Sequence, residues 1–511
     1  MESKNCHLVV LCHGLWGVSD HFAYIEAQLR TYSSLNPSDE QLVVYTTKTN
    51  ERFRTYDGID LCGTRVAEEI LAESLRLQEQ GLAVRRFSVV GYSLGGLIAR
   101  YAIGVLYYRG FFQDIEPVNF TTFCSPHVGV LTPGSGVSIR IFNWLVPILL
   151  GKSGHQLFLK DSSVPLLKLM SLPNTVFFRG LAQFKNISLY SNIRSDIRTS
   201  WWCSGISYVN PFDILDKNPN VKIDKDGYIH FENGSKFSLK FVPNYEPVIL
   251  DVDQPITFTG LVDGSSKSNL NQMVQEDLPD DNDADGNAAG CSKTANFFQR
   301  KFKWAIMLFK FGVYLPMWVT WFVLHNWLQV INSTVRVVKE SSKLHSLLEL
   351  CDEPEPVSRP PLTKRLSEAS LDLNRFESGL HDHGDEFIDS VFDAITSTKD
   401  INRSIFDNRE NGPLSLTTTI KKLGEFDLAT ETSKTQDADR YRQILAPFKL
   451  DLSPEQKDII KHLNTLPWHK YPLYITKTNA THAAAIVRHE DPAFEEGKVV
   501  VQHFVQHVFE H

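Results

Sequence analysis

One short motif, Gly-Tyr-Ser-Leu-Gly at residues 91–95, constrains the fold of this chain more than any other feature. It follows the apolar, β-branched run 87–90 and opens the stretch 94–107, whose apolar residues recur with the period of a helix. A G-x-S-x-G turn between a strand and a helix is a nucleophile elbow, which presents its serine at the edge of a parallel sheet. The motif therefore predicts an α/β-hydrolase fold, with a mostly parallel central sheet and Ser93 as the nucleophile.

A second glycine-rich turn, His-Gly-Leu-Trp-Gly at residues 13–17, directly follows the apolar run 7–12, which reads as a buried strand. In α/β-hydrolases one oxyanion donor follows the nucleophile and another comes from a loop after an early strand. The backbone N–H groups of Leu94 and Leu15 are therefore expected to bind the oxyanion, and losing one such donor costs about 3 kcal/mol. The alternative is a tight turn with a buried tryptophan, but the order of the two motifs favours an oxyanion hole.

A catalytic serine needs a base, and the base needs a carboxylate that orients it. The chain order in this fold is serine, then acid, then histidine. The strand expected at 187–191 is followed by Asp196, and a carboxylate just past the carboxyl end of a strand is where the acid belongs. Asp196 is therefore the predicted acid, with Asp213 and Asp216 as alternatives.

The last strong strand pattern lies at 471–476, and His482 follows it on a loop before a helix-like run at 483–488. A histidine after the final core strand fits the position of the base, so His482 is the predicted base. His489 is the alternative, although it lies two helical turns further on. His127 precedes any acid strand and is interpreted as a structural histidine near the pocket floor.

Composition limits the remaining possibilities. A chain of 511 residues allows one large domain with insertions, and its net charge of −8 argues against general nucleic-acid binding. The seven cysteines are scattered without metal-ligand spacing, and the first strand pattern begins by His7, which leaves no room for a secretory signal. We therefore expect a reducing, cytosolic environment, and neither a metal nor a cofactor.

The predicted acid and base are separated by a stretch far longer than an α/β-hydrolase requires. Composition changes along it several times, from turn-rich alternation to acidic and polar, to apolar, and back to polar. The predicted parts of the chain are the N-terminal part of the hydrolase core at 1–205, a small β-rich insertion at 206–262, an acidic disordered linker at 263–296, a hydrophobic hairpin at 297–338, a polar, partly disordered region at 352–445, and the C-terminal part of the core at 446–511.

The apolar and aromatic segment 304–331 has basic residues on both sides. About 20 apolar residues cross a bilayer once, so two crossings need about 40, more than this segment offers. A single crossing would place His482 and Ser93 on opposite sides of the bilayer. We therefore expect a hairpin, broken at Pro316, that enters one leaflet or a droplet monolayer and returns, with its basic flanks at the headgroups. A buried core helix is the alternative.

These motifs together resemble the fungal serine-esterase family of Rog1-like lipases, which includes lipid-droplet phospholipases. The resemblance rests on the motifs at residues 13–17, 56–60, 91–100, 125–130 and 151–154, and continues through 192–196 and 479–487. It implies a triad of Ser93, Asp196 and His482 and an activity of lipid ester hydrolysis.

The expected function is hydrolysis of glycerolipid esters, most of all phospholipids, at a lipid droplet or at the cytosolic face of the endoplasmic reticulum membrane. Two enzyme alternatives stay open, a monoacylglycerol lipase and a lysolipid acyltransferase. A droplet-anchored scaffold that keeps a hydrolase shell is the non-enzyme alternative, which the intact serine, aspartate and histidine disfavour. The sequence does not predict an oligomeric state.

Overall fold

The computed structural model describes residues 4–196, 198–212, 215, 228–230, 236–252, 256–259, 315–340, 418–420 and 450–511. The chain divides into two units, which are described separately: Met1–Leu261 with Ser333–His511, and Val262–Asn332.

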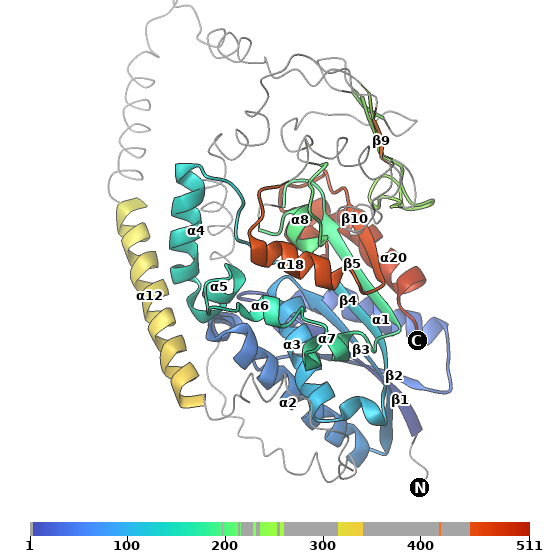
Figure 1. The fold of residues 1–511 in the computed structure, drawn as a ribbon. Helices are drawn as coiled ribbons and strands as arrows, with labels where there is room; N and C mark the ends of the chain where they lie inside the picture. Colours follow the sequence, from blue (N-terminus) through green and yellow to red (C-terminus); the bar gives the residue numbers. More distant parts are fainter. Residues whose placement is uncertain are drawn as a thin grey trace, which may run out of the picture. The chain divides into compact units, whose positions relative to one another are not determined.

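The first unit is built on a six-stranded sheet in which every neighbouring pair of strands is parallel. Its strand order is β10-β5-β4-β3-β1-β2. The strands are β1 (Lys4–Cys12), β2 (Gln41–Thr46), β3 (Leu82–Tyr92), β4 (Glu116–Phe123), β5 (Asn186–Asn192) and β10 (Trp468–Leu473). This parallel sheet confirms the predicted α/β-hydrolase fold (Figure 1).

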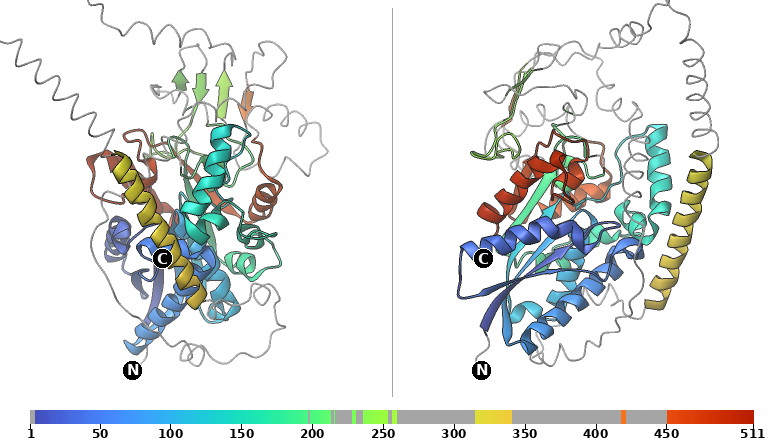
Figure 2. Two further views of the ribbon diagram at one scale, coloured as in Figure 1. Left: turned by 90° about the vertical axis from the view of Figure 1, so that its left-hand side faces the viewer. Right: turned by 180° about the vertical axis from the view of Figure 1, so that it is seen from behind.

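Helices cover both faces of this sheet, as in a doubly wound α/β protein (Figure 2). On one face α1 (Ala23–Leu35) packs against α20 (Glu495–His503). On the other face α3 (Leu94–Tyr108) packs between α2 (Ile59–Glu79) and α7 (Val176–Leu181). Because both faces are covered, the central strands β1, β3, β4 and β5 are buried over most of their length.

The last strand of the sheet lies three residues earlier than the predicted range 471–476. β10 pairs with β5 from Trp468 to Leu473, and the pairing ends there. The next residue, Tyr474, instead donates its backbone N–H to the carbonyl of Val248 at 2.8 Å. The apolar pattern thus continues beyond the sheet, because Tyr474 and Ile475 are buried by other segments of the core.

A second, four-stranded antiparallel sheet has the order β6-β7-β8-β9. Three of its strands, β6 (Tyr228–His230), β7 (Lys236–Ser238) and β8 (Ile256–Thr259), lie within the range predicted as a small β-rich insertion. The fourth, β9 (Thr418–Ile420), comes from the range predicted as polar and partly disordered. The predicted linker at 263–296 lies outside the described residues.

The apolar segment ends in α12 (Leu315–Glu340), a helix of 26 residues. Pro316 lies in its first turn, where a missing N–H does not interrupt the helix. Residues 297–314 lie outside the described part, so the hairpin stays a prediction. In the described part of the chain, no helix has both the length and the apolar character needed to cross a membrane.

The last turn of α12, which belongs to the first unit, is held by a cluster of charged side chains. Asp57, at the end of the 3-10 helix η2 (Arg52–Asp57), is fully buried and accepts hydrogen bonds from two guanidinium groups. Arg336 lies 2.8 Å from one of its oxygens and Arg65 lies 2.9 Å from the other. Arg65 also contacts Glu340 at 2.9 Å. We call these four residues the Asp57 cluster.

Candidate active site

The nucleophile elbow is present at the predicted position, between β3 and α3. Ser93 has φ 54° and ψ −127°, a strained conformation for a residue with a side chain. Its backbone N–H bonds the carbonyl of Phe123 at 2.9 Å, which fixes the turn to the neighbouring strand. A Cβ atom on Gly95 would lie 2.1 Å from the carbonyl oxygen of Cys12, so only glycine fits there.

The 13–17 turn lies against the elbow, as expected for an oxyanion loop. A Cβ atom on Gly14 would lie 2.8 Å from Ser93 Cβ, so the two backbones touch. The turn is held by Trp16, whose N–H donates to Thr55 Oγ1 at 3.1 Å and whose indole Nε1 donates to Tyr56 at 3.0 Å. The position of the turn beside Ser93 therefore depends on residues of η2.

The two predicted oxyanion donors both line the pocket that contains Ser93. Leu94 is the first residue of α3, so its N–H has no acceptor within the helix and lies at the positive end of the helix dipole. Leu15 precedes Trp16, whose own N–H is already used by Thr55. The geometry is thus compatible with two N–H groups directed at a substrate oxygen, and their role stays a prediction.

The structure brings the predicted acid and base into direct contact. His482 Nδ1 lies 2.9 Å from Asp196 Oδ2. The carboxylate also accepts bonds from Asn192 Nδ2 at 3.0 Å and from the backbone N–H of Thr199 at 2.8 Å. Burial favours a higher pKa for Asp196, but the charge of His482 and these hydrogen bonds outweigh it and lower the pKa below its usual value. Asp196 is therefore ionised and suited to orient an imidazole.

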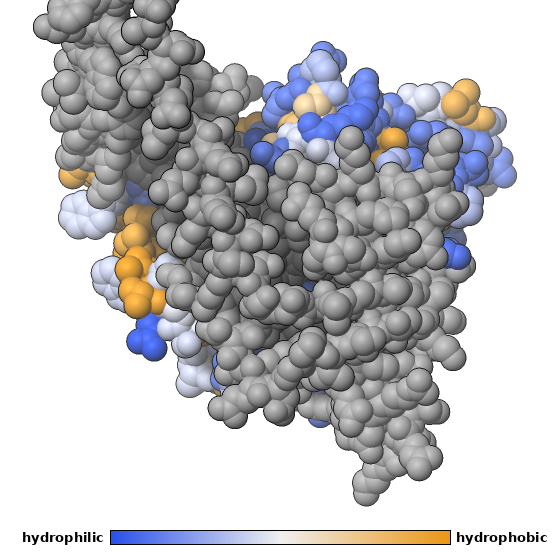
Figure 3. Space-filling view, turned by 90° about the horizontal axis from the view of Figure 1, so that it is seen from above, coloured by the Kyte–Doolittle hydropathy of each residue, from blue (hydrophilic) through white to orange (hydrophobic). Residues whose placement is uncertain are grey.

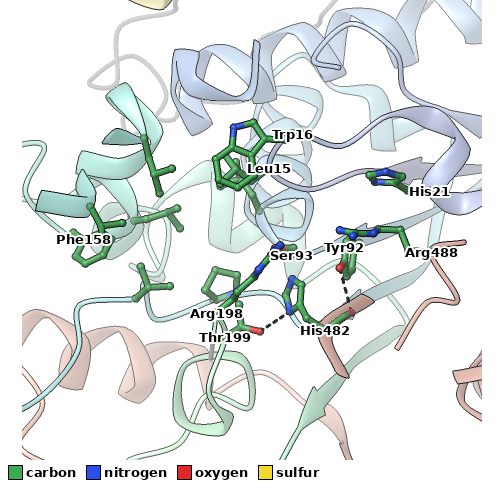
Figure 4. Close-up of a pocket in the computed structure, with 16 residues that line it drawn as sticks. Leu15, Trp16, His21, Tyr92, Ser93, Phe158, Arg198, Thr199, His482 and Arg488 are labelled. Atoms are coloured by element: carbon green, nitrogen blue, oxygen red, sulfur yellow. Dashed lines mark hydrogen bonds between the residues drawn. The ribbon is translucent and has the colours of Figure 1, made fainter. Parts of the chain in front are cut away.

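The contact with Asp196 fixes the orientation of the His482 ring. When Nδ1 donates to the carboxylate, Nε2 is left as the acceptor a general base requires. Ser93 and His482 line the same pocket, and Figure 4 shows them side by side. Among the described contacts no hydrogen bond joins Ser93 Oγ to His482. Such bonds are commonly long in ligand-free enzymes and shorten when substrate binds.

The alternative residues lie elsewhere. His489 is exposed and faces Asp491, with His489 Nε2 3.9 Å from the carboxylate. His127 is fully buried and bonds Thr122 at 2.9 Å, and it does not line the pocket. Asp213 and Asp216 lie outside the described residues. The helix expected at 483–488 is a single turn, α19 (Thr481–Ala484), which includes His482.

Cys124, Asp196 and His482 have potential metal-ligand atoms within 4.8 Å of one another. Burial and the nearby Asp196 carboxylate raise the pKa of Cys124 well above its usual value, so its thiol stays protonated. Metal binding needs a thiolate, and the facing atoms of Asp196 and His482 are already bonded to each other. These three residues are better explained as an acid–base pair with a neutral thiol beside it.

The pocket has an apolar wall opposite Ser93 and His482. The space within the pocket is about 670 Å³ when its open mouth is included. The apolar wall comes from the segments before, within and after helices α4 (Val137–Leu149) and α5 (Gly151–Leu157), and consists of Val130, Val146, Leu150, Leu157 and Phe158. Such a wall suits the acyl chain of an ester substrate.

Two cationic side chains that sequence reasoning missed, Arg198 and Arg488, also line the pocket (Figure 4). Burial raises the pKa of Tyr92, and the positive charges of Arg488 and Arg198 oppose this rise. The two arginines therefore lie near the Tyr92 hydroxyl. Arg198 is two residues beyond the predicted acid and Arg488 is six beyond the predicted base. This closeness in sequence was the one signal that could have indicated the two arginines. It is a weak signal, because arginines often occur near such residues in a sequence.

A parallel sheet, a serine on a strained elbow and an aspartate–histidine pair on one pocket define the serine-hydrolase class of α/β-hydrolase folds. Residues 2–204 match the family described as "Putative serine esterase (DUF676)". The predicted resemblance to Rog1-like lipases is thereby confirmed.

Curated relatives include "Putative lipase ROG1" of Saccharomyces cerevisiae, which is 34% identical over 226 residues, 43% of this chain and 31% of that protein. "Putative lipase C4A8.10" of Schizosaccharomyces pombe is 30% identical over 248 residues, 47% of this chain and 30% of that protein. The matched region thus spans about a third of the length of these relatives. Among solved structures, "Phospholipase PlaB from Legionella pneumophila in complex with thio-NAD" aligns at 15% identity and a TM-score of 0.26, covering 37% of this chain and 38% of that one, a likeness too low to inform on activity.

Proposed function

We propose that this chain hydrolyses acyl ester bonds of glycerolipids, most of all phospholipids, at the surface of a lipid droplet or of the endoplasmic reticulum membrane. One observation carries the proposal. Ser93 and the hydrogen-bonded pair of His482 and Asp196 line a single pocket whose opposite wall is apolar. The match of residues 2–204 to the serine-esterase family supports the same reaction class.

In the proposed mechanism, Ser93 Oγ attacks the ester carbonyl while His482 Nε2 removes its proton. The N–H groups of Leu15 and Leu94 stabilise the oxyanion, and the protonated imidazole then gives its proton to the leaving alcohol. Water, activated by the same histidine, releases the fatty acid from Ser93. Asp196 holds the imidazole in the required tautomer throughout.

The choice of phospholipids over neutral glycerolipids is supported by the charges at the pocket. A phosphodiester is a permanent anion at neutral pH, and arginine is the side chain best suited to bind phosphate. Arg198 and Arg488 line the pocket together with Ser93. A monoacylglycerol offers these two cations no charged partner, so the pair favours the phospholipid substrate.

We expect Arg198→Gln and Arg488→Gln each to lower kcat/KM for phospholipids by about 10-fold or more, since a hydrogen bond to a charged group contributes about 1.5–3 kcal/mol. Hydrolysis of a monoacylglycerol should change little. The measurement is headgroup-resolved lipid hydrolysis by the purified full chain. Arg30→Gln, which removes an arginine on α1 far outside the pocket lining, is the matched control. Equal losses on both substrates would contradict a phosphate-binding role.

The proposed location follows from the resemblance and from the position of the apolar segment between the catalytic residues in the chain. Ser93 and His482 line one pocket, which supports an insertion that leaves and returns on the same side of a lipid surface. We expect the fluorescently tagged full chain to coincide with neutral-lipid stain in cells, and a chain lacking 297–338 to do so less. Unchanged droplet targeting of the shortened chain would contradict the proposed hairpin anchor.

A further inference from the structure

Helix α4 exposes a row of large apolar side chains on one face. Val137 is 71% exposed, Ile141 52%, Trp144 65% and Ile148 43%. Their spacing of four, three and four residues places them on one stripe of the helix. We call this stripe the α4 face. Scattered exposed apolar residues are normal in proteins, but a continuous row on one helix marks an interaction surface.

The opposite side of the same helix is also apolar and is buried. Ile139, Phe142 and Val146 are at most 6% exposed. Val146, together with Leu150 at the end of the helix, lines the pocket that holds the catalytic serine. A single helix therefore lies between the interior of the active site and an exposed apolar surface.

The segment of the chain that contains α4 has charged residues of one sign only, and one of them, Lys152, is paired with Asp60 at 2.6 Å. Residues 117–160 contain no aspartate or glutamate, whereas Arg140, Lys152 and Lys160 lie in this range. Arg140 is exposed and lies on α4 itself, beside the α4 face. In the view of Figure 3, the described surface at the upper right is mainly hydrophilic. Apolar and aromatic residues with basic neighbours are typical of helices that bind anionic lipid surfaces.

We propose that the α4 face docks on an anionic phospholipid surface and that acyl chains reach the catalytic pocket along the inner side of α4. The path of acyl chains to the pocket rests on the proposed function, whereas docking of the α4 face does not. The occupant is a lipid surface rather than a second copy of the chain. If two copies met at their α4 faces, basic residues would face basic residues with no acidic partner between them. The residues of the α4 face lie outside the range 297–338 of the predicted hairpin.

The experiment compares the full chain with the double variant Ile141→Ser, Trp144→Ser. Two rates are measured, one for phospholipid in vesicles of phosphatidylcholine and phosphatidylserine, the other for a soluble short-chain p-nitrophenyl ester. We expect the ratio of vesicle rate to soluble-ester rate to fall about 10-fold or more, because two large apolar side chains no longer enter the lipid. Activity on the soluble ester reports that the variant is folded. Leu35→Ser, which removes a leucine that is 74% exposed at the end of α1, is the matched control and should keep the parent ratio.

If the double variant has the same ratio of vesicle rate to soluble-ester rate as the parent chain, the assignment of α4 as the docking surface is wrong. An equal fall in the Leu35→Ser control would also overturn it. If the double variant instead changes the oligomeric state in gel filtration while the ratio stays constant, a second copy of the chain covers the α4 face and the proposal is wrong. Failure of the parent chain to cleave either substrate would refute the proposed function, and sedimentation with the vesicles would then still test docking.

Discussion

Replacing Ser93 by alanine should lower kcat/KM for ester hydrolysis by about 10⁴-fold or more, on glycerolipids and on short-chain esters alike. The substitution removes the nucleophile, and no neighbouring group can replace it on the strained elbow. Alanine preserves the backbone and fills less space than serine, so the fold should persist. Hydrolysis by purified full chains, with circular dichroism as a check on folding, measures the effect. Parent-level activity of this variant would refute the serine-hydrolase mechanism.

The same reaction tests the base. His482→Ala should reduce activity about as strongly as Ser93→Ala, since members of a triad act as a unit. His489→Ala is the matched control, because that histidine is exposed and faces Asp491 rather than the pocket. The two losses in a Ser93→Ala, His482→Ala double variant should not add. Loss of activity in the His489 variant with retention in the His482 variant would reverse the assignment.

The second large effect concerns stability. Asp57→Ala should destabilise the chain by about 3–5 kcal/mol, because it removes the fully buried one of the two carboxylates that pair with the buried guanidinium of Arg65. It also removes the partner of Arg336 on α12. Urea unfolding followed by tryptophan fluorescence measures the change. Arg30→Gln is the control, since its exposed pair with Glu26 should contribute no more than about 1 kcal/mol.

An Asp57→Ala variant as stable as the Arg30→Gln control would show that the Asp57 cluster does not hold α12 to the core. Asp57→Asn offers a second comparison, since it keeps the shape of the side chain and removes its charge. We expect it to be destabilised as well, because an amide cannot accept bonds from two guanidinium groups as a carboxylate does. Equal stability of the asparagine variant and the parent would contradict an electrostatic role.

The parts of the site that could be predicted are those that a short stretch of sequence identifies by itself. The elbow at Ser93 is recognisable because a strand, a tight turn and a helix follow one another within a few residues. Asp196 and His482 could be placed because each follows a strand of the parallel sheet. The structure brings these two side chains within 2.9 Å of each other.

The features that could not be predicted depend on contacts between distant segments. Asp57 and Arg336 lie 279 positions apart, and nothing in either local sequence indicates the other. The two apolar faces of α4 read in sequence only as a hydrophobic helix, since a pattern cannot tell which face will be covered. β9, with three residues in a polar region, is too short for any periodicity to reveal.

The position of β10 at the edge of the sheet has a consequence for how the chain is made. The ribosome synthesises the nucleophile early and the predicted base late, after the whole insertion. Any nascent or truncated chain that ends before residue 482 carries Ser93 without its base. Under the proposed mechanism, hydrolytic competence therefore arises only once His482 has been synthesised and β10 has joined β5.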